Sequence, residues 1–160
     1  MAVDMFIKIG DVGGESKDAG HKGEIDVLSW SWGMSQSGTM HGGGGGGAGK
    51  VNVQDLSLTK WMDASSSALM KACCAGTHIP EALLTVRKAG DKPLEYLKIK
   101  LTNVLVSSLS TGGSGGEDRL TENVSLNFEK VNVEYNTQDA KGGKDKPFLM
   151  GWDIAANEAA

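Results

Sequence analysis

The sequence predicts an all-β protein, a barrel or sandwich of antiparallel strands with one appended α-helix. Apolar and polar side chains alternate along most of the chain, which is the pattern of half-buried strands. Short turn-forming stretches interrupt this alternation repeatedly, and only one segment has the apolar spacing of a helix. At 160 residues, the range 1–160 is expected to form a single domain with a substantial core.

The chain begins with an alternating segment. Met5, Ile7 and Ile9 share one face of a predicted first strand. The following stretch, 10–23, is rich in glycine and polar residues and is expected to turn the chain.

A second strand is predicted over 25–36, and its two faces differ in character. The odd positions are mostly small and hydroxylic and include Ser29 and Ser31, which suits close contact with backbone or with water. The even positions carry large apolar side chains, so we expect that face in the core: Leu28, Trp30, Trp32 and Met34.

A glycine-rich loop is predicted over about 38–50, because consecutive glycines lose much backbone entropy when they order. A strand resumes at Val51 and Val53, and its apolar phase changes at Leu56 and Leu58, which predicts a bulge. The loop contains an unbroken tract of six glycines: Gly42, Gly43, Gly44, Gly45, Gly46 and Gly47.

The one helix is predicted over 63–75. Asp63 suits the N-cap, Leu69 and Cys73 are spaced for one face, and Gly76 suits a left-handed stop. Cys74 follows Cys73 directly. Neighbours on a helix point about 100° apart, so we expect two reduced thiols rather than a disulfide.

Four further strands are predicted in the second half of the chain, over 82–88, 96–106, 124–135 and about 148–154. Within 124–135 the apolar residues change from even to odd positions, which predicts a bulge where a sheet curls toward closure.

Two short segments match sequence motifs of enzymes in part. The segment 112–116 matches the hydrolase pattern G-x-S-x-G around Ser114, but another strand is predicted after it, and all three histidines precede it. The segment 44–50 imitates a phosphate-binding loop, but Val51 stands where Ser or Thr should hold magnesium, and a strand follows. We therefore expect no enzyme, and no nucleotide or other cofactor.

Composition excludes several other classes. The net charge is −4, and no cluster of Lys and Arg suggests nucleic-acid binding. No apolar run is long enough to cross a membrane. Cys73, Cys74 and His78 lie too close together to form a tetrahedral metal site by themselves. The N-terminus lacks the features of a cleavable signal peptide, so we expect folding in the cytoplasm.

Five stretches, in order along the whole chain, resemble the Hcp (haemolysin-coregulated protein) family of bacterial type VI secretion systems. They contain DMFIKI at 4–9, SWSWGMSQS within 25–38, GKVNVQDL at 49–56, SGGEDRLTEN within 112–124 and WDI at 152–154. The glycine tract is longer than the family pattern.

The resemblance implies a β-barrel with one helix, hexameric rings of identical copies, and a tube of stacked rings that a contractile sheath expels behind a spike protein. It also implies secretion and the carriage of small effector toxins in the lumen. Ser29 and Ser31 are then candidates for the lumen wall, and the glycine tract for contacts between rings. A monomeric ligand-binding barrel and a hydrolase that uses Ser114 remain as alternatives.

Overall fold

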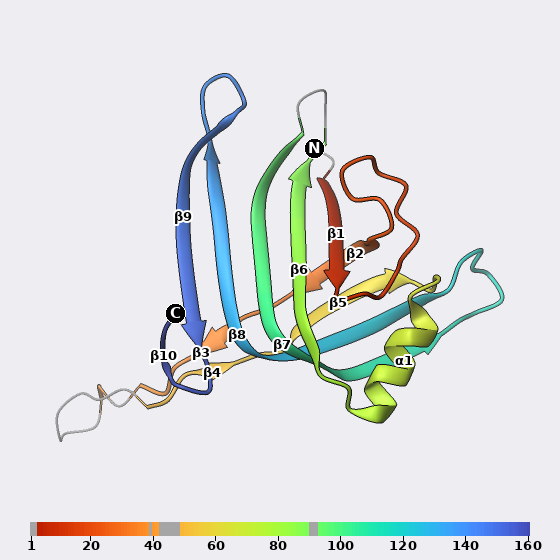
Figure 1. The fold of residues 1–160 in the computed structure, drawn as a ribbon, viewed down its shortest axis with the longest axis horizontal. Coiled ribbons are helices and arrows are strands. Elements are labelled where there is room, and N and C mark those ends of the chain that lie inside the picture. Colours follow the sequence, from red (N-terminus) through yellow and green to blue (C-terminus); the bar gives the residue numbers. More distant parts are fainter. Residues whose placement is uncertain (1–2, 39, 42–48, 90–92) are drawn as a thin grey trace.

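The computed structural model describes residues 3–38, 40–41, 49–89 and 93–160. This part of the chain holds one helix, α1 (Ser66–Ala75), and ten strands (Figure 1). The strands are β1 (Val3–Ile9), β2 (Ile25–Ser31), β3 (Met34–Ser35), β4 (Asn52–Val53), β5 (Leu56–Trp61), β6 (Ile79–Lys88), β7 (Leu94–Gly112), β8 (Thr121–Gln138), β9 (Lys144–Asp153) and β10 (Glu158–Ala159).

Six antiparallel strands close into a barrel in the order β8-β5-β2-β1-β6-β7, because β7 pairs back onto β8. The remaining strands of this sheet, β9 and β10, continue outward from β8 and lie outside the closed barrel. Strands β3 and β4 form a separate two-stranded sheet. The predicted fold class, antiparallel strands with one appended helix, is confirmed in its barrel form.

The two longest strands, β7 and β8, bend so that each serves two parts of the sheet (Figure 1). The first half of β8 pairs with β5 and its second half pairs with β9. The apolar phase change predicted inside 124–135 falls at this exchange of partners. The predicted bulge there is wrong, because the β7–β8 register instead shifts between Val106 and Ser108.

One continuous apolar core fills the barrel. Its members come from all six barrel strands and from α1, and the residues with no exposed surface are Ile7, Ile9, Ile25, Leu56, Leu69, Val104 and Leu126. Burial of this kind contributes about 1.5–3 kcal/mol for each large aliphatic side chain. The core therefore supplies most of the stabilisation.

The prediction for 25–36 is wrong at two of its four core positions. Leu28 is 38% and Met34 is 46% exposed, whereas Val27 is buried. The register between β2 and β5 shifts between Val27 and Ser29, and this bulge turns the side chains that follow onto the opposite faces. Trp30 and Trp32, beyond the shift, pack against the core as predicted, whereas Met34 is exposed because it belongs to β3 in the separate two-stranded sheet.

The prediction of one bulged strand over 51–58 is also wrong, because two separate strands cover this segment. Val53 belongs to β4, which pairs with β3, and a new strand, β5, begins at Leu56. The chain thus passes from the two-stranded sheet to the barrel sheet between Val53 and Leu56. The change of apolar phase marks this passage and not a bulge within one strand. The glycine tract 42–47, proposed for contacts between rings, lies outside the described residues.

Helix α1 is shorter at its start than predicted. Ser65 is the N-cap, and Asp63 instead accepts hydrogen bonds from the backbone N–H of Ser65 (2.8 Å) and from its hydroxyl. The predicted C-terminus is confirmed, because Gly76 adopts a left-handed φ of 64° directly after Ala75. The four strands predicted after the helix are found as β6, β7, β8 and β9, with β7 and β8 longer than expected.

Candidate functional site

The two serines predicted to line a channel lie on β2, with their side chains on the outside of the barrel. Both are exposed, while Trp30 between them points toward the core. Across the β2–β5 ladder, Ser29 is paired with Thr59 and Ser31 with Ser57. Directly opposite residues of antiparallel strands project to the same face, so β5 continues the surface that these serines begin.

The same two rows continue across β8 and β7. Ser57 is paired with Ser125 and Thr59 with Asn123 on β8, and these two positions are paired with β7 in turn. Eight side chains from four neighbouring strands therefore share one outer face. We call this face the polar wall: Ser29, Ser31, Ser57, Thr59, Ser108, Ser110, Asn123 and Ser125.

The polar wall carries no charged side chain, and its members bond to one another only in part. The hydroxyl of Thr59 donates to Oδ1 of Asn123 at 2.7 Å, and Ser57 Oγ lies 3.3 Å from Ser125 Oγ. No large apolar side chain interrupts the two rows. Such a surface can exchange hydrogen bonds with water or with varied polar partners and offers no strong adhesive patch.

Charges stand only at the margins of the polar wall. Beyond one row, Asp55 accepts hydrogen bonds from Ser107 Oγ (2.6 Å) and Asn127 Nδ2 (2.8 Å). Beyond the other row, the guanidinium of Arg119 lies 4.4 Å from the ring centre of Trp61. Glu117 lines a pocket with Ser110 and Asn123 on that same side, so the wall is a neutral strip with one acidic border and one border of mixed charge.

Beneath the polar wall, a buried charged cluster joins β5, β8 and α1. Lys60 and Glu122 have no exposed surface and form an ion pair, and Lys60 Nζ also lies 3.1 Å from Asp63 Oδ1. Ser66, at the start of α1, donates its hydroxyl to Glu122 Oε1 at 2.7 Å. The second carboxylate oxygen of Glu122 has no hydrogen-bond partner among the residues that the structure describes. This cluster fixes the helix to the back of the strands that carry the wall.

Sequence reasoning found only two of the eight wall residues. The alternation that marks the others is present in the sequence, in L-S-L-T at 56–59 and N-V-S-L at 123–126. It identifies small polar faces, but it cannot show that separate segments lie side by side in register. The glycines 42–47, the other candidate site, cannot be placed relative to the wall, since they are outside the described residues.

The hydrolase-like motif is located in a hairpin turn. Ser114 lies between the end of β7 and the start of β8, so a strand and not a helix follows it. The shallow pocket beside it is lined by Glu117 and by residues of the two strands. His21 and His78 make their contacts elsewhere, to Glu95 and Asn103 respectively. This geometry differs from the strand–turn–helix that a nucleophilic serine of this motif requires.

Cys73 is partly buried and Cys74 is exposed, and both are free thiols on α1. Among the residues that the structure describes, no group of three or more His, Cys, Asp or Glu side chains is arranged to hold a metal ion. No helix in that part of the chain is long and apolar enough to span a membrane.

The fold and the site define an antiparallel β-barrel protein with one helix and an extended polar outer face. The family model described as "Type VI secretion system effector, Hcp" matches residues 6–135. The chain is 67% identical over 162 residues to Protein hcp1 of Pseudomonas aeruginosa, with 100% of both chains covered. The chain therefore belongs to the Hcp family of type VI secretion proteins.

Solved structures agree with this assignment. A structure titled as a type six secretion system protein superposes with a TM-score of 0.93 at 36% identity, covering 99% of this chain and 100% of that one. Hcp1 from Salmonella typhimurium gives a TM-score of 0.83 at 42% identity, with 100% of both chains covered. The type VI secretion Hcp family and its barrel fold are thereby established for this chain.

Proposed function

We propose that this protein is the structural subunit of a type VI secretion inner tube. Copies form hexameric rings, the rings stack, and the polar wall lines the channel. The observation that carries the proposal is the polar wall, eight uncharged Ser, Thr and Asn side chains in two rows across four strands. A wetted channel wall needs small polar side chains outside and apolar side chains behind them, and these strands alternate in that way.

Self-assembly is supported by an apolar face that the single chain leaves uncovered. Tyr135 of β8 is paired with Phe148 of β9, and Val133 with Met150, on the face that continues the barrel core. Tyr135, Phe148 and Met150 are 46%, 53% and 39% exposed. Contiguous apolar residues on an outer strand mark an interaction surface, and a second copy is the occupant that a ring provides.

The remaining partners follow from membership of the family. In this proposal the stacked rings are enclosed by a contractile sheath and tipped by a spike protein, and they carry small effectors past the polar wall. In this proposal the protein folds in the bacterial cytoplasm and leaves the cell within the expelled tube. No enzymatic step, cofactor, nucleic acid or membrane insertion is part of this function.

The purified chain should have the mass of a hexamer in light scattering at micromolar concentration, and electron micrographs should show rings. Added metal, nucleotide or cofactor should leave this mass unchanged. A monomeric mass at all concentrations would reject the tube-subunit proposal in favour of a monomeric ligand-binding barrel.

Replacing Ser31 by glutamine should reduce the retention of a co-expressed small effector about fivefold while rings persist, because the longer side chain blocks hydrogen bonds worth about 1 kcal/mol. Pull-down from cells that express both proteins measures this. Ser67→Gln, on the exposed face of α1, is the matched control and should retain the effector fully. Loss of rings would place Ser31 in a subunit interface, and unchanged retention would remove it from the cargo surface.

A further inference from the structure

The loop 10–24, between β1 and β2, folds back beside β1 (Figure 1), and its Asp18 is bound by Arg87 of β6. It is an ordered hairpin-like segment with its own backbone bonds. The N–H of Gly14 donates to Gly23 O at 2.8 Å, and the N–H of Gly23 donates to Ser16 O at 2.9 Å. Gly14 allows this close approach, because a Cβ there would lie 2.4 Å from the carbonyl oxygen of Glu24. The tube proposal gives this loop no role.

One anchor of the loop is an ion pair that stays charged. Arg87 of β6 donates to both carboxylate oxygens of Asp18, at 2.7 and 3.0 Å, and also to Asp4 of β1 at 3.1 Å. The hydrogen bond from Arg87 lowers the pKa of Asp18 to about 2. Since an arginine keeps its proton throughout the neutral range, this anchor does not respond to changes of pH near neutrality.

The second anchor is His21, which is only 7% exposed. Its ring stacks on Phe6 of β1, with the ring centres 4.4 Å apart and the planes at 9°. Nδ1 lies 2.9 Å from Glu24 Oε2 in the loop, and Nε2 lies 2.6 Å from Glu95 Oε1 on β7. Ionised carboxylates only accept hydrogen bonds, and a neutral imidazole has only one N–H to donate. Both contacts are therefore made only by the charged imidazolium.

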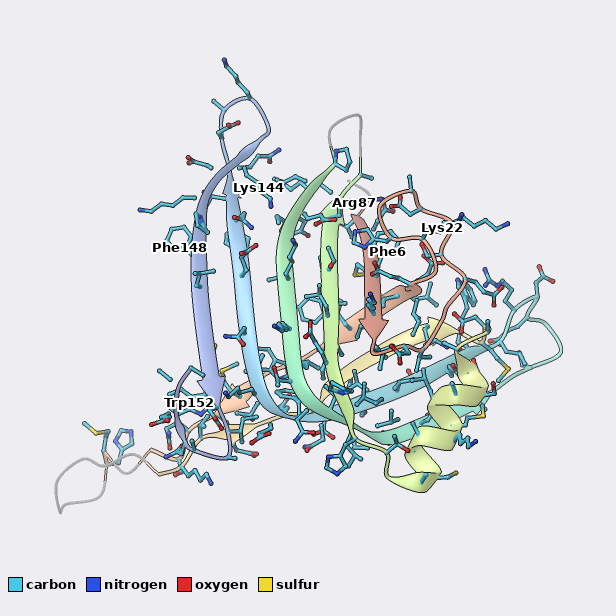
Figure 2. The ribbon with its side chains drawn as sticks, viewed as in Figure 1. Phe6, Lys22, Arg87, Lys144, Phe148 and Trp152 are labelled. Carbon is cyan, nitrogen blue, oxygen red and sulfur yellow. The ribbon has the colours of Figure 1, made fainter. Side chains whose placement is uncertain are left out.

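The other charges around His21 do not replace it. Lys98 lies 3.4 Å from the second oxygen of Glu95, and Arg87, 5.1 Å from the ring centre of Phe6, is already engaged by Asp18 and Asp4. Figure 2 shows Phe6 and Arg87 together beneath the loop, with Lys22 directed outward. If the imidazole loses its proton to solvent, one of Glu24 and Glu95 loses its hydrogen bond from the ring, and the two carboxylates flank a neutral imidazole.

We propose that His21 is a pH-sensitive latch that holds residues 20–24 against β7 when its imidazole is charged and loosens them when the imidazole is neutral. The segment is therefore held more firmly at the lower pH, where the imidazole is charged, than at the higher pH, where it is neutral. The Asp18–Arg87 pair keeps the preceding part of the loop attached at both pH values. Opening of the latch therefore frees only residues 20–24.

At low pH the latch depends on Glu95, and there it is lost when the pH falls rather than when it rises. Burial tends to raise the pKa of Glu95, but the hydrogen bond and charge of His21, together with Lys98, hold it below its ordinary value. A carboxyl group whose pKa is lowered in the folded protein stabilises the fold at pH values above its ordinary pKa. This stabilisation is lost as the pH falls through the pKa of the folded state. Protonation of Glu95 thus opens the latch in acid, and loss of the His21 proton opens it in alkali.

Amide hydrogen exchange of the full-length, assembled protein at about pH 6 and about pH 8 tests the latch, after correction for the intrinsic effect of pH on exchange. The amides of Gly23 and Glu24, which donate to Ser16 and His21 within the loop, report on opening. A lost hydrogen bond between charged groups corresponds to about a tenfold change or more, so opening should be about tenfold more frequent at the higher pH. In the His21→Gln variant, opening of this segment should be equally frequent at both pH values.

His78→Gln is the matched control, because His78 is exposed and its ring nitrogen lies 3.2 Å from Asn103 Oδ1, away from the loop 10–24, and it should keep the wild-type response. Glu95→Gln retains the histidine but removes one carboxylate, and it should weaken the response even if His21→Gln fails to fold. The latch is rejected if the wild type opens equally at both pH values, or if His21→Gln or Glu95→Gln responds as the wild type does. These readouts do not depend on whether the copies form a tube.

Discussion

Replacing Lys60 by methionine should lower the free energy of unfolding by about 3–5 kcal/mol, the typical cost of removing one partner of a buried ion pair. Lys60 and Glu122 have no exposed surface, and Asp63 is nearly buried beside them. Without the ammonium group, two carboxylates share a site that water does not reach. Chemical denaturation of the variant and the wild type, under conditions where both have the same assembly state, measures the loss.

An exposed ion pair provides the matched control for Lys60→Met. Lys100 and Glu81 lie 3.7 Å apart, and their side chains are 48% and 54% exposed, so Lys100→Met should cost less than about 1 kcal/mol. The double variant Lys60→Met with Glu122→Leu should recover much of the lost stability, because the orphaned charge disappears. An equal loss of unfolding free energy in the Lys60 and Lys100 variants would show that burial of the cluster does not explain its contribution to stability.

Replacing Phe148 by glutamate should abolish ring formation while the single chain remains folded. Phe148 is 53% exposed on β9, an outer strand beyond the closed barrel, so a polar residue there costs an isolated chain little (Figure 2). In a ring the same carboxylate would have to be buried in an apolar contact, at a cost of several kcal/mol at every interface. Light scattering should show the mass of one chain, with the circular dichroism of the folded barrel unchanged.

Lys22→Glu serves as the control for Phe148→Glu, since it introduces the same side chain at an exposed position on the loop 10–24. It should leave the ring intact. If Phe148→Glu remains a hexamer, the apolar face of β8 and β9 is not part of the ring interface, although the tube proposal stands. If the wild type is itself a monomer, the tube proposal fails first.

The candidate site could be predicted from the sequence only in part. Ser29 and Ser31 were identifiable because small hydroxylic residues alternate with large ones along a single segment. The six further residues of the polar wall belong to β5, β7 and β8, and their place beside the serines depends on ladder pairings between distant segments. His21 carried no sequence signal, because Glu95, its partner on β7, is 74 residues away.

Errors in the predicted core have a similar physical cause. Leu28 and Met34 were assigned to the core by a strict two-residue period, but Leu28 lies in the bulge between Val27 and Ser29, and Met34 belongs to β3 in the separate two-stranded sheet. The exposed face of β9 could not be recognised either. Phe148 and Met150 have the composition of core residues, and only the closure of the barrel without β9 leaves them uncovered.

By itself, the sequence determined the properties that depend on neighbours along the chain: the alternation of the strands, the position of the single helix and its stop at Gly76, and the family to which the chain belongs. The tertiary structure decided the closure of six strands, the joining of four polar strand faces into one wall, and the burial of Lys60 against Glu122. These features depend on register between segments far apart in the chain. A shift of one residue reverses every side chain of a strand, and local periodicity does not contain that information.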